Sequence, residues 1–251
     1  MGNDTDLYIL TGASRGLGLA MAQQLLQPGH ALLCIARHAE PALAEQATRS
    51  GCALEQWTLD LADAVAAAAR LRQWLAAAPR HRSATLINNA GVIPPIGPLA
   101  TVAPQAIAQA LRINLEAPMA LTAAFLAATD SWGVPRRVLN ISSGLGRRPM
   151  AAQATYCASK AGLDHYTRCL ALEEARKPGG AKVCALAPGV IDTAMQVQLR
   201  GADAAAFPDR GRFEQLKSQG LLDSPEAAAR KVLAYLQRPD FGAEPVADVR
   251  G

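Results

Sequence analysis

The stretch Leu7-Tyr8-Ile9-Leu10-Thr11-Gly12-Ala13-Ser14-Arg15-Gly16-Leu17-Gly18 decides the fold of this chain. An apolar run over residues 7–11 predicts a strand, and it leads directly into the glycine pattern GxxxGxG and a helical pattern that ends near Gln27. Glycines in such a turn let backbone N–H groups approach a pyrophosphate, towards which the following helix points its N-terminus. An ordinary strand-to-helix turn could use the same glycines, but the position favours a dinucleotide site, whose expected residues are Gly12, Ser14, Arg15, Gly16, Leu17 and Gly18.

The alternation of short apolar runs with longer helical stretches continues along the 251 residues. The runs that predict strands are residues 7–11, 31–36, 53–59, 84–88, 137–142, 182–187 and 245–249. The first six are nearly continuous in apolar character, as strands buried on both faces are. No linker rich in Pro, Gly or Ser divides the chain. We therefore expect an α/β fold, one domain over residues 1–251, with a parallel sheet and helices on both faces.

The composition argues against several classes of protein. Aromatic residues make up only 4% of the chain and the net charge is +4, with the basic residues scattered, so we expect no nucleic-acid partner. The five cysteines contain no CxxC pair and the four histidines no HxxxH pair, so we expect neither disulfides nor a metal site, and a cytoplasmic location. The polar N-terminus and the lack of an apolar run near ~20 residues argue against a signal peptide and a membrane partner.

Residues after the next three strands bear on the choice of cofactor. NAD enzymes usually carry Asp or Glu after the second strand, whereas this chain has Arg37, 19 residues beyond Gly18. Together with Arg15 it could clamp a 2′-phosphate, which favours NADP(H); the alternative is two solvated surface arginines. Asp60 follows the third strand and could bind the adenine amino group or cap the next helix. The small and amide side chains of Asn88–Gly91, after the fourth strand, would let the chain pass close to the cofactor and brace neighbouring loops.

The pentapeptide Tyr156-Cys157-Ala158-Ser159-Lys160 carries the strongest catalytic signal. It lies in a helical pattern, so Tyr156 and Lys160 share one face, and a lysine ammonium beside a phenol favours the phenolate and lowers its pKa. Tyr156 is then a candidate general acid or base. Ser143, at the end of the fifth strand, could hydrogen-bond a substrate carbonyl. Asn114 lies within a predicted long helix whose interior does not favour Asn.

These motifs, in this order and at these spacings, resemble the short-chain dehydrogenase/reductase family over essentially the whole length of the chain. The stretches that match are Thr11–Gly18, Asn88–Gly91, Asn114, Ser143, Tyr156-x-x-x-Lys160 and Pro188–Thr193. The resemblance implies a doubly wound, Rossmann-like fold whose parallel sheet has seven strands. It also implies that the cofactor is bound by the glycine turn and by Arg37, Asp60, Asn89, Ala90, Gly91, Tyr156, Lys160, Pro188, Gly189, Ile191 and Thr193.

The resemblance assigns a role to each catalytic residue. Tyr156 would donate a proton to the carbonyl oxygen, and Lys160 would bind the nicotinamide ribose and lower the pKa of the tyrosine. Ser143 would polarise the carbonyl, and Asn114 would hold a water that connects Lys160 to solvent. Thr193 would bind the carboxamide or the pyrophosphate. The cofactor supplies the hydride.

Within the family, two short stretches resemble the sepiapterin reductases and bacterial benzil reductases: residues 192–196, with Met195 and Gln196, and residues 246–249, with Asp248. A pterin's guanidine-like edge could bind to Asp248; the alternative is a solvated carboxylate. Residues 194–222 contain no strand pattern, so we expect a substrate lid in which Met195, Leu199, Phe207 and Phe213 cover a flat ring.

The sequence therefore predicts an NADPH-dependent carbonyl reductase that transfers hydride to a ketone, with a pterin side-chain ketone or a vicinal diketone as candidate substrates. Two alternatives remain: a non-enzymatic NADPH-binding sensor on the same fold, which need not retain all four catalytic residues, and an NAD-dependent alcohol dehydrogenase, which Arg37 argues against. The Ala- and Leu-rich helical patterns over residues 104–128 and 153–174 correspond to helices that pair between subunits in the family, so we expect a homodimer or homotetramer.

Overall fold

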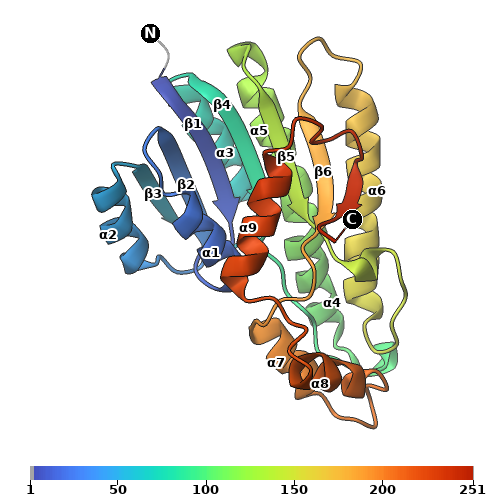
Figure 1. Ribbon diagram of the computed structural model, residues 1–251. Helices are drawn as coiled ribbons and strands as arrows, with labels where there is room; N and C mark the ends of the chain where they lie inside the picture. The colour runs from blue at the N-terminus through green and yellow to red at the C-terminus, as the bar shows by residue number, and fades with distance from the viewer. Residues whose placement is uncertain (1–2, 251) are drawn as a thin grey trace.

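The computed structural model describes residues 3–250 and builds a parallel sheet whose order is β3-β2-β1-β4-β5-β6-β7. The strands are β1 (Asn3–Thr11), β2 (His30–Ala36), β3 (Ala53–Thr58), β4 (His81–Asn88), β5 (Arg136–Ile141), β6 (Lys182–Ala187) and β7 (Val246–Asp248). The order reverses between β1 and β4, and a crevice opens there at the carboxyl ends of the strands. The expected doubly wound, Rossmann-like sheet is confirmed (Figure 1).

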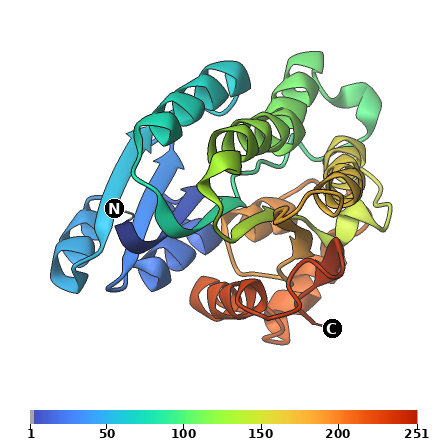
Figure 2. The same ribbon diagram turned by 90° about the horizontal axis from the view of Figure 1, so that it is seen from above.

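Helices cover both faces of the sheet, as Figure 2 shows from above. On one face α1 (Gly16–Leu25) packs against α9 (Pro225–Leu236), and α2 (Pro41–Ser50) lies beside α1. On the other face α3 (Ala64–Ala77) packs against α5 (Ala117–Thr129), next to α4 (Pro104–Leu111) and α6 (Ala154–Glu174). Two further helices, α7 (Ala194–Arg200) and α8 (Arg210–Ser218), extend beyond the carboxyl-terminal edge of the sheet (Figure 1).

Alternation along β1 shows why the strands are apolar throughout. Leu7 and Ile9 belong to the hydrophobic core beneath α3 and α5, whereas Tyr8 and Leu10 belong to the core beneath α1 and α9. Successive side chains of a strand point to opposite faces, so a strand between two helix layers must be apolar at every position. These two cores fix the carboxyl ends of the strands, where the site residues lie.

Polar residues extend two strands beyond the apolar runs that predict them. The structure begins β1 at Asn3 and β4 at His81, ahead of the expected Leu7 and Ala84. Asp6 accepts hydrogen bonds from Ser83 Oγ (2.6 Å) and from the Arg82 guanidinium. Polar side chains therefore hold the amino-terminal ends of β1 and β4 together. Hydrophobic periodicity cannot detect such strand ends.

The helix expected over residues 104–128 is divided by a π-helical turn, η2 (Arg112–Glu116), between α4 and α5. Asn114, at the centre of this turn, is completely buried. Its side-chain oxygen accepts from Val92 N and its nitrogen donates to Val92 O, both at 2.8 Å. One extra residue in the turn therefore aims a buried amide at the loop after β4, which agrees with the frequent occurrence of π turns at functional sites.

Residues 194–222 contain two helices, α7 and α8, which are joined by turns over residues 201–209. Leu199, Phe207 and Phe213 make a small core of their own, in which the two phenyl rings stack at 5.7 Å between centroids. Phe207 is fully buried in this core and does not border the cavity described below, so the expectation that it covers a substrate ring is wrong. The phenyl ring instead holds α7 and α8 together.

Candidate active site

A cavity of about 1050 Å³ lies at the carboxyl-terminal edge of the sheet, where the strand order reverses. It runs from the glycine turn after β1, past the ends of β4 and β5, to α7 and α8. With two exceptions, every site residue that the sequence predicts for cofactor, catalysis or substrate borders this cavity. Phe207 is buried in the core of α7 and α8, and Asn114 lies behind the wall formed by residues 91–93. The structure thus brings together residues that are separated by more than 200 positions in the chain.

The glycine turn is shaped by contacts that exclude a side chain. A Cβ on Gly18 would lie 2.0 Å from the Gly12 carbonyl oxygen, and Gly12 itself has a φ of +72°. The Asn89 amide braces the turn from the loop after β4, because its Nδ2 donates to Thr11 O (2.9 Å) and Gly12 O (3.3 Å). The backbone of the turn can therefore approach a ligand closely, as a dinucleotide requires.

The residues present fit a dinucleotide phosphate and its adenosine. The N-terminus of the ten-residue helix α1 opens onto the cavity, and no side chain caps its free N–H groups, since Arg15 at the cap position makes no capping hydrogen bond. Such uncapped N–H groups and the helix dipole favour an anion. Arg15 and Arg37 are both exposed beside this end of the cavity, and neither takes part in an ion pair within residues 3–250.

The contacts of Asp60 bear on its two predicted roles, which are binding the adenine amino group and capping the next helix. Its Oδ1 accepts from Ala62 N (2.9 Å) in the turn after β3, whereas the N-cap of α3 is Asp63, which accepts from Ala66 N (3.0 Å). Capping of the next helix by Asp60 is thus not what the structure shows. The Asp60 side chain remains on the wall of the cavity.

Gly91, in the loop after β4, lies close to Lys160 of α6, and Thr193, in the loop after β6, lies close to the glycine turn. A Cβ on Gly91 would lie 3.5 Å from Asn114 Oδ1 and 3.8 Å from Lys160 Nζ. A Cβ on Gly16 would lie 3.4 Å from Thr193 Cγ2, so the loop after β6 meets the start of α1. Pro188, Gly189 and Ile191 of the loop after β6 and Ala90 of the loop after β4 also border the cavity.

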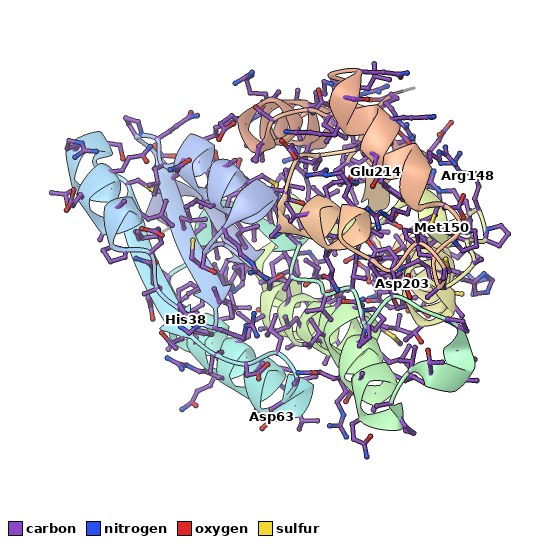
Figure 3. All side chains as sticks on the ribbon, turned by 90° about the horizontal axis from the view of Figure 1, so that it is seen from below. His38, Asp63, Arg148, Met150, Asp203 and Glu214 are labelled. Carbon is purple, nitrogen blue, oxygen red and sulfur yellow. The ribbon has the colours of Figure 1, made fainter. Side chains whose placement is uncertain are left out.

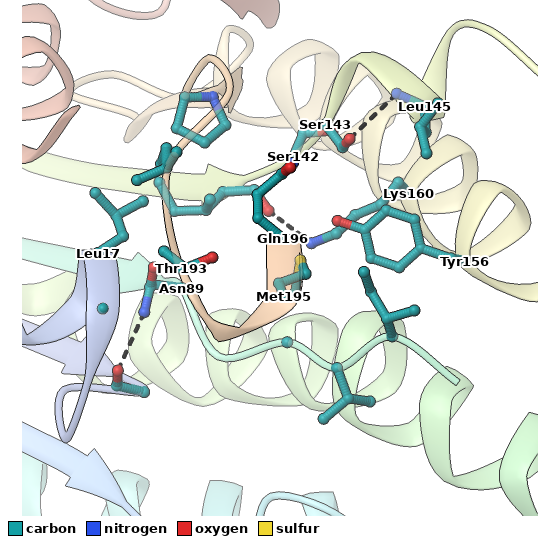
Figure 4. Close-up of a pocket in the computed structure, with 18 of the residues that line it drawn as sticks. Leu17, Asn89, Ser142, Ser143, Leu145, Tyr156, Lys160, Thr193, Met195 and Gln196 are labelled. Carbon is teal, nitrogen blue, oxygen red and sulfur yellow. Dashed lines mark hydrogen bonds between the residues drawn. The ribbon is translucent and has the colours of Figure 1, made fainter. Parts of the chain in front are cut away.

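Ser143, Tyr156 and Lys160 meet on one wall of the cavity (Figure 4). Tyr156 and Lys160 lie one turn apart on α6, and the Lys160 ammonium is 5.9 Å from the centre of the Tyr156 ring. Lys160 Nζ donates to Ile141 O (2.8 Å), which ties α6 to the end of β5. Ser143 follows two residues later, and its Oγ accepts from Leu145 N (3.2 Å) at the start of a short helical turn.

Burial decides the protonation of these groups. Burial raises the pKa of Tyr156 to about 12, with a smaller opposing effect of a hydrogen bond from Ser143, and burial lowers the pKa of Lys160 to about 8. The sequence predicts that Lys160 lowers the pKa of Tyr156. In the structure the pKa of Tyr156 is raised instead, because desolvation of the phenolate outweighs every other effect. A phenol that keeps its proton at neutral pH is suited to donate it.

A buried carboxylate supports this wall from behind. Asp164 is 1% exposed, and its Oδ1 accepts a hydrogen bond from Ser142 Oγ at the end of β5. Its Oδ2 lies 3.5 Å from Arg147 Nε, and Arg147 Nη2 donates to Ala247 O (3.1 Å) on β7. The network joins β5, α6 and β7 around the turn that carries Ser143. Burial raises the pKa of Asp164, and the hydrogen bond from Ser142 lowers it.

At the far end the cavity is bordered by side chains of α7, α8 and the residues 145–153. Figure 3 shows Arg148 and Met150 on the side of Asp203 and Glu214, away from His38 and Asp63. Met195 and Gln196 border this end. Asp248 also borders it, but its carboxylate forms an ion pair with Arg250 (2.7 Å), which holds the pKa of Asp248 below its usual range.

Sequence reasoning missed several residues of this end. Gln153, Arg148 and Met150 border the cavity, and Asp164 supports it, although no short motif marks them. The spacing of Asp164, four residues after Lys160, was the one available signal, because residues four apart on a helix share a face. Gln153 lies just before α6, where sequence alone predicts no more than a helix start.

Two features are absent from residues 3–250. No helix in this part of the chain has the length and apolar character needed to cross a membrane. Within the same residues no group of three or more His, Cys, Asp or Glu side chains is arranged to hold a metal ion.

Comparisons with known proteins agree with this geometry. The sequence pattern of the family described as short chain dehydrogenase matches residues 7–204. The chain belongs to this family. It is 37% identical over 237 residues to a benzil reductase ((S)-benzoin forming) of Bacillus cereus, covering 93% of this chain and 94% of the relative. It is 36% identical over 250 residues to the sepiapterin reductase of Meriones unguiculatus, covering 93% of this chain and 92% of the relative.

A solved structure of a short-chain dehydrogenase/reductase from Burkholderia vietnamiensis superimposes with a TM-score of 0.66 and 36% identity, and the match covers 99% of both chains. As a member of the family, the chain is an oxidoreductase that uses a nicotinamide cofactor and acts on CH–OH or C=O groups. The expected resemblance to the benzil and sepiapterin reductase subgroup is confirmed.

Proposed function

We propose that the chain is an NADPH-dependent reductase of ketones whose carbonyl is activated by a neighbouring electron-withdrawing group, such as a vicinal diketone or a pterin side-chain ketone. The convergence of Ser143, Tyr156 and Lys160 on one wall of a cavity that begins at the glycine turn carries this proposal. The similarity to benzil and sepiapterin reductases supports the substrate class.

The catalytic roles follow from the positions of the side chains. A bound reduced nicotinamide would supply a hydride to the carbonyl carbon. Tyr156, which burial keeps protonated, donates its proton to the carbonyl oxygen, and Ser143 orients and polarises that oxygen by donating a hydrogen bond. Lys160 stands beside the phenol, and the hydrogen bond to Ile141 O fixes its direction. Asn114 bridges Val92 and Ser159 and holds the loop after β4 against α6.

The choice of NADPH rests on Arg15 and Arg37. Both guanidinium groups are exposed at the end of the cavity formed by the glycine turn and the end of β2, and neither takes part in an ion pair with a described carboxylate. Charge-assisted bonds to a 2′-phosphate are worth about 1.5–3 kcal/mol each, which corresponds to a preference over NADH of at least ~10-fold. The loop after β6, with Pro188, Gly189, Ile191 and Thr193, would hold the nicotinamide end.

We assign residues 194–222 as the lid over the substrate. Met195, Leu199 and Phe213 supply an apolar wall, and Gln196 a polar one. Binding of a pterin by Asp248 would compete with its ion pair to Arg250, so this contact requires Arg250 to move. Residues 1–251 would act as one domain, and the exposed side chains Leu111, Met119 and Leu172 on α4, α5 and α6 support a homodimer or homotetramer through these helices.

The test measures oxidation of NADPH and NADH with benzil and with sepiapterin, for the natural chain and for Arg37→Asp. We expect reduction with NADPH and loss or reversal of the cofactor preference in the variant. Arg72→Asp, on the exposed face of α3 and outside the cavity, is the matched control and should keep the preference. Cofactor binding without turnover of any carbonyl would favour a sensor, and better alcohol oxidation with NAD would favour an alcohol dehydrogenase.

A further inference from the structure

The side-chain amide of Gln153 has no hydrogen-bond partner among residues 3–250, although the residue is almost completely buried. The residue is 2% exposed and borders the cavity, and neither Nε2 nor Oε1 finds a partner within residues 3–250. Gln196, on the lid side of the same cavity, is 7% exposed and its Oε1 is equally without a partner. Buried polar atoms are nearly always paired in folded proteins, so three unpaired amide atoms in the wall of one cavity need an explanation.

The residue before Gln153 is strained. Ala152 has a φ of +61°, and it is the one residue other than glycine with a positive φ in the described part of the chain. Its carbonyl accepts from Gly97 N (3.2 Å), which holds the loop in this form. Strained backbone and unpaired buried groups both oppose folding, and structures retain them at ligand-binding positions more often than elsewhere. Here they occur at adjacent residues, four and three positions before Tyr156.

We infer that Gln153, together with Gln196, selects a substrate that carries its own hydrogen-bond donor beside the ketone, such as a lactam N–H or a hydroxyl. The inference rests on the function proposed above and narrows its substrate class. Both orphaned oxygens are acceptors and require a donor, while Gln153 Nε2 also seeks an acceptor. An amide or hydroxyl group offers both, whereas a diketone such as benzil offers acceptors alone.

A buried polar group that is left unpaired costs more free energy than an ordinary hydrogen bond contributes. The terminal amide turns about a soft torsion, so it can face a substrate that fills this end of the cavity. A substrate with the donor pairs the amide, whereas an analogue without it leaves the same atoms unpaired in a dry site. Sites that hydrogen-bond an N–H or O–H group discriminate strongly against analogues that lack it.

Isatin and N-methylisatin provide a matched pair of probes, because both carry an activated ketone on a flat ring and a methyl group replaces the N–H donor in the second. We expect the natural chain to reduce isatin with a kcat/KM at least ~10-fold above that for N-methylisatin. Gln153→Met, which preserves length without polar atoms, should bring this ratio close to one by raising the value for N-methylisatin. Gln196→Met should lower the ratio independently.

Thermal unfolding separates a substrate role from a structural one. Removing an orphaned amide from a buried position should raise the Tm of Gln153→Met, whereas a structural hydrogen bond at this position would make Tm fall. Gln73→Met, exposed on α3 and far from the cavity, should leave both the ratio and the Tm as they are. Equal kcat/KM values for isatin and N-methylisatin in the natural chain, or an undiminished ratio in Gln153→Met, would overturn the inference. A lack of NADPH-dependent reduction of isatin, N-methylisatin and benzil alike would instead overturn the proposed function.

Discussion

Replacement of Gly18 by alanine tests how the glycine turn makes room for a cofactor. The added Cβ would lie 2.0 Å from Gly12 O and 2.5 Å from Asn89 Nδ2, whereas a carbon and a carbonyl oxygen in contact are separated by ~3.3 Å. The turn would therefore have to move by about 1.3 Å. It cannot retreat freely, because a Cβ on Gly12 would itself be only 2.9 Å from the Ala90 backbone.

The expected cost follows from these contacts. Overpacking of this kind costs about 1–3 kcal/mol, and loss of the hydrogen bonds from Asn89 Nδ2 adds about 1 kcal/mol. A total of about 2–4 kcal/mol lowers Tm by roughly 5–15 °C in a chain of this size. Displacement of the N–H groups that face the phosphate should weaken NADPH binding by at least ~10-fold.

Calorimetric titration of NADPH and thermal unfolding measure both effects. Gly211→Ala is the matched control, since Gly211 lies in α8 with no atom within 4 Å of an added Cβ. It should raise stability by at most ~1 kcal/mol, because alanine favours a helix over glycine, and leave NADPH binding intact. A Gly18→Ala protein with the Kd and Tm of the natural chain would refute the argument that this turn is closed to a side chain.

Three further predictions concern the catalytic wall. Tyr156→Phe should lower kcat by at least ~100-fold while NADPH still binds, as measured by steady-state kinetics and titration; a near-normal kcat would contradict its role as proton donor. Burial lowers the pKa of Lys160 from 10.5 to about 8, so the unfolded chain holds a proton that the folded chain loses between these pH values. The stability of the natural chain relative to Lys160→Met should therefore rise from pH 8 to 10.5 in denaturant unfolding, and a flat difference would refute the assignment. The charge of Asp164 raises the pKa of Lys160, so Asp164→Asn should move the alkaline limb of the kcat/KM profile to lower pH, and an unmoved limb would show that the two groups are uncoupled.

Most of the fold can be predicted from the sequence because both faces of the sheet are covered. Strands such as residues 7–11 are apolar at every position, and the glycine turn locates the start of α1. The π turn around Asn114 cannot be predicted in this way, because its extra residue is stabilised by contacts with Val92 that lie 22 positions away. The helices of the lid were equally hidden, since Phe207 and Phe213 form a core that is visible only once the segment has folded back on itself.

The residues of the candidate site likewise fall into those that the sequence predicts and those that only the fold reveals. Residues such as Tyr156 and Lys160 are predictable because their chemistry depends on a fixed spacing along one helix. Gln153 and Arg148 are not, because their importance comes from the cavity that they border, and the cavity is assembled from distant segments. The pKa of Tyr156 shows a further limit: the nearby lysine is evident in the sequence, but the degree of burial that outweighs it is a property of the folded chain.

Transfer of a labelled hydride tests the central claim most directly. The natural chain is incubated with a ketone such as benzil and NADPH that carries deuterium at the transferable C4 position, and the product alcohol is analysed by mass spectrometry. The account predicts one deuterium at the new carbinol carbon of the product formed by the natural chain. In Tyr156→Phe the deuterated product should no longer form. An alcohol product without deuterium, or no alcohol product with any activated ketone, would contradict it.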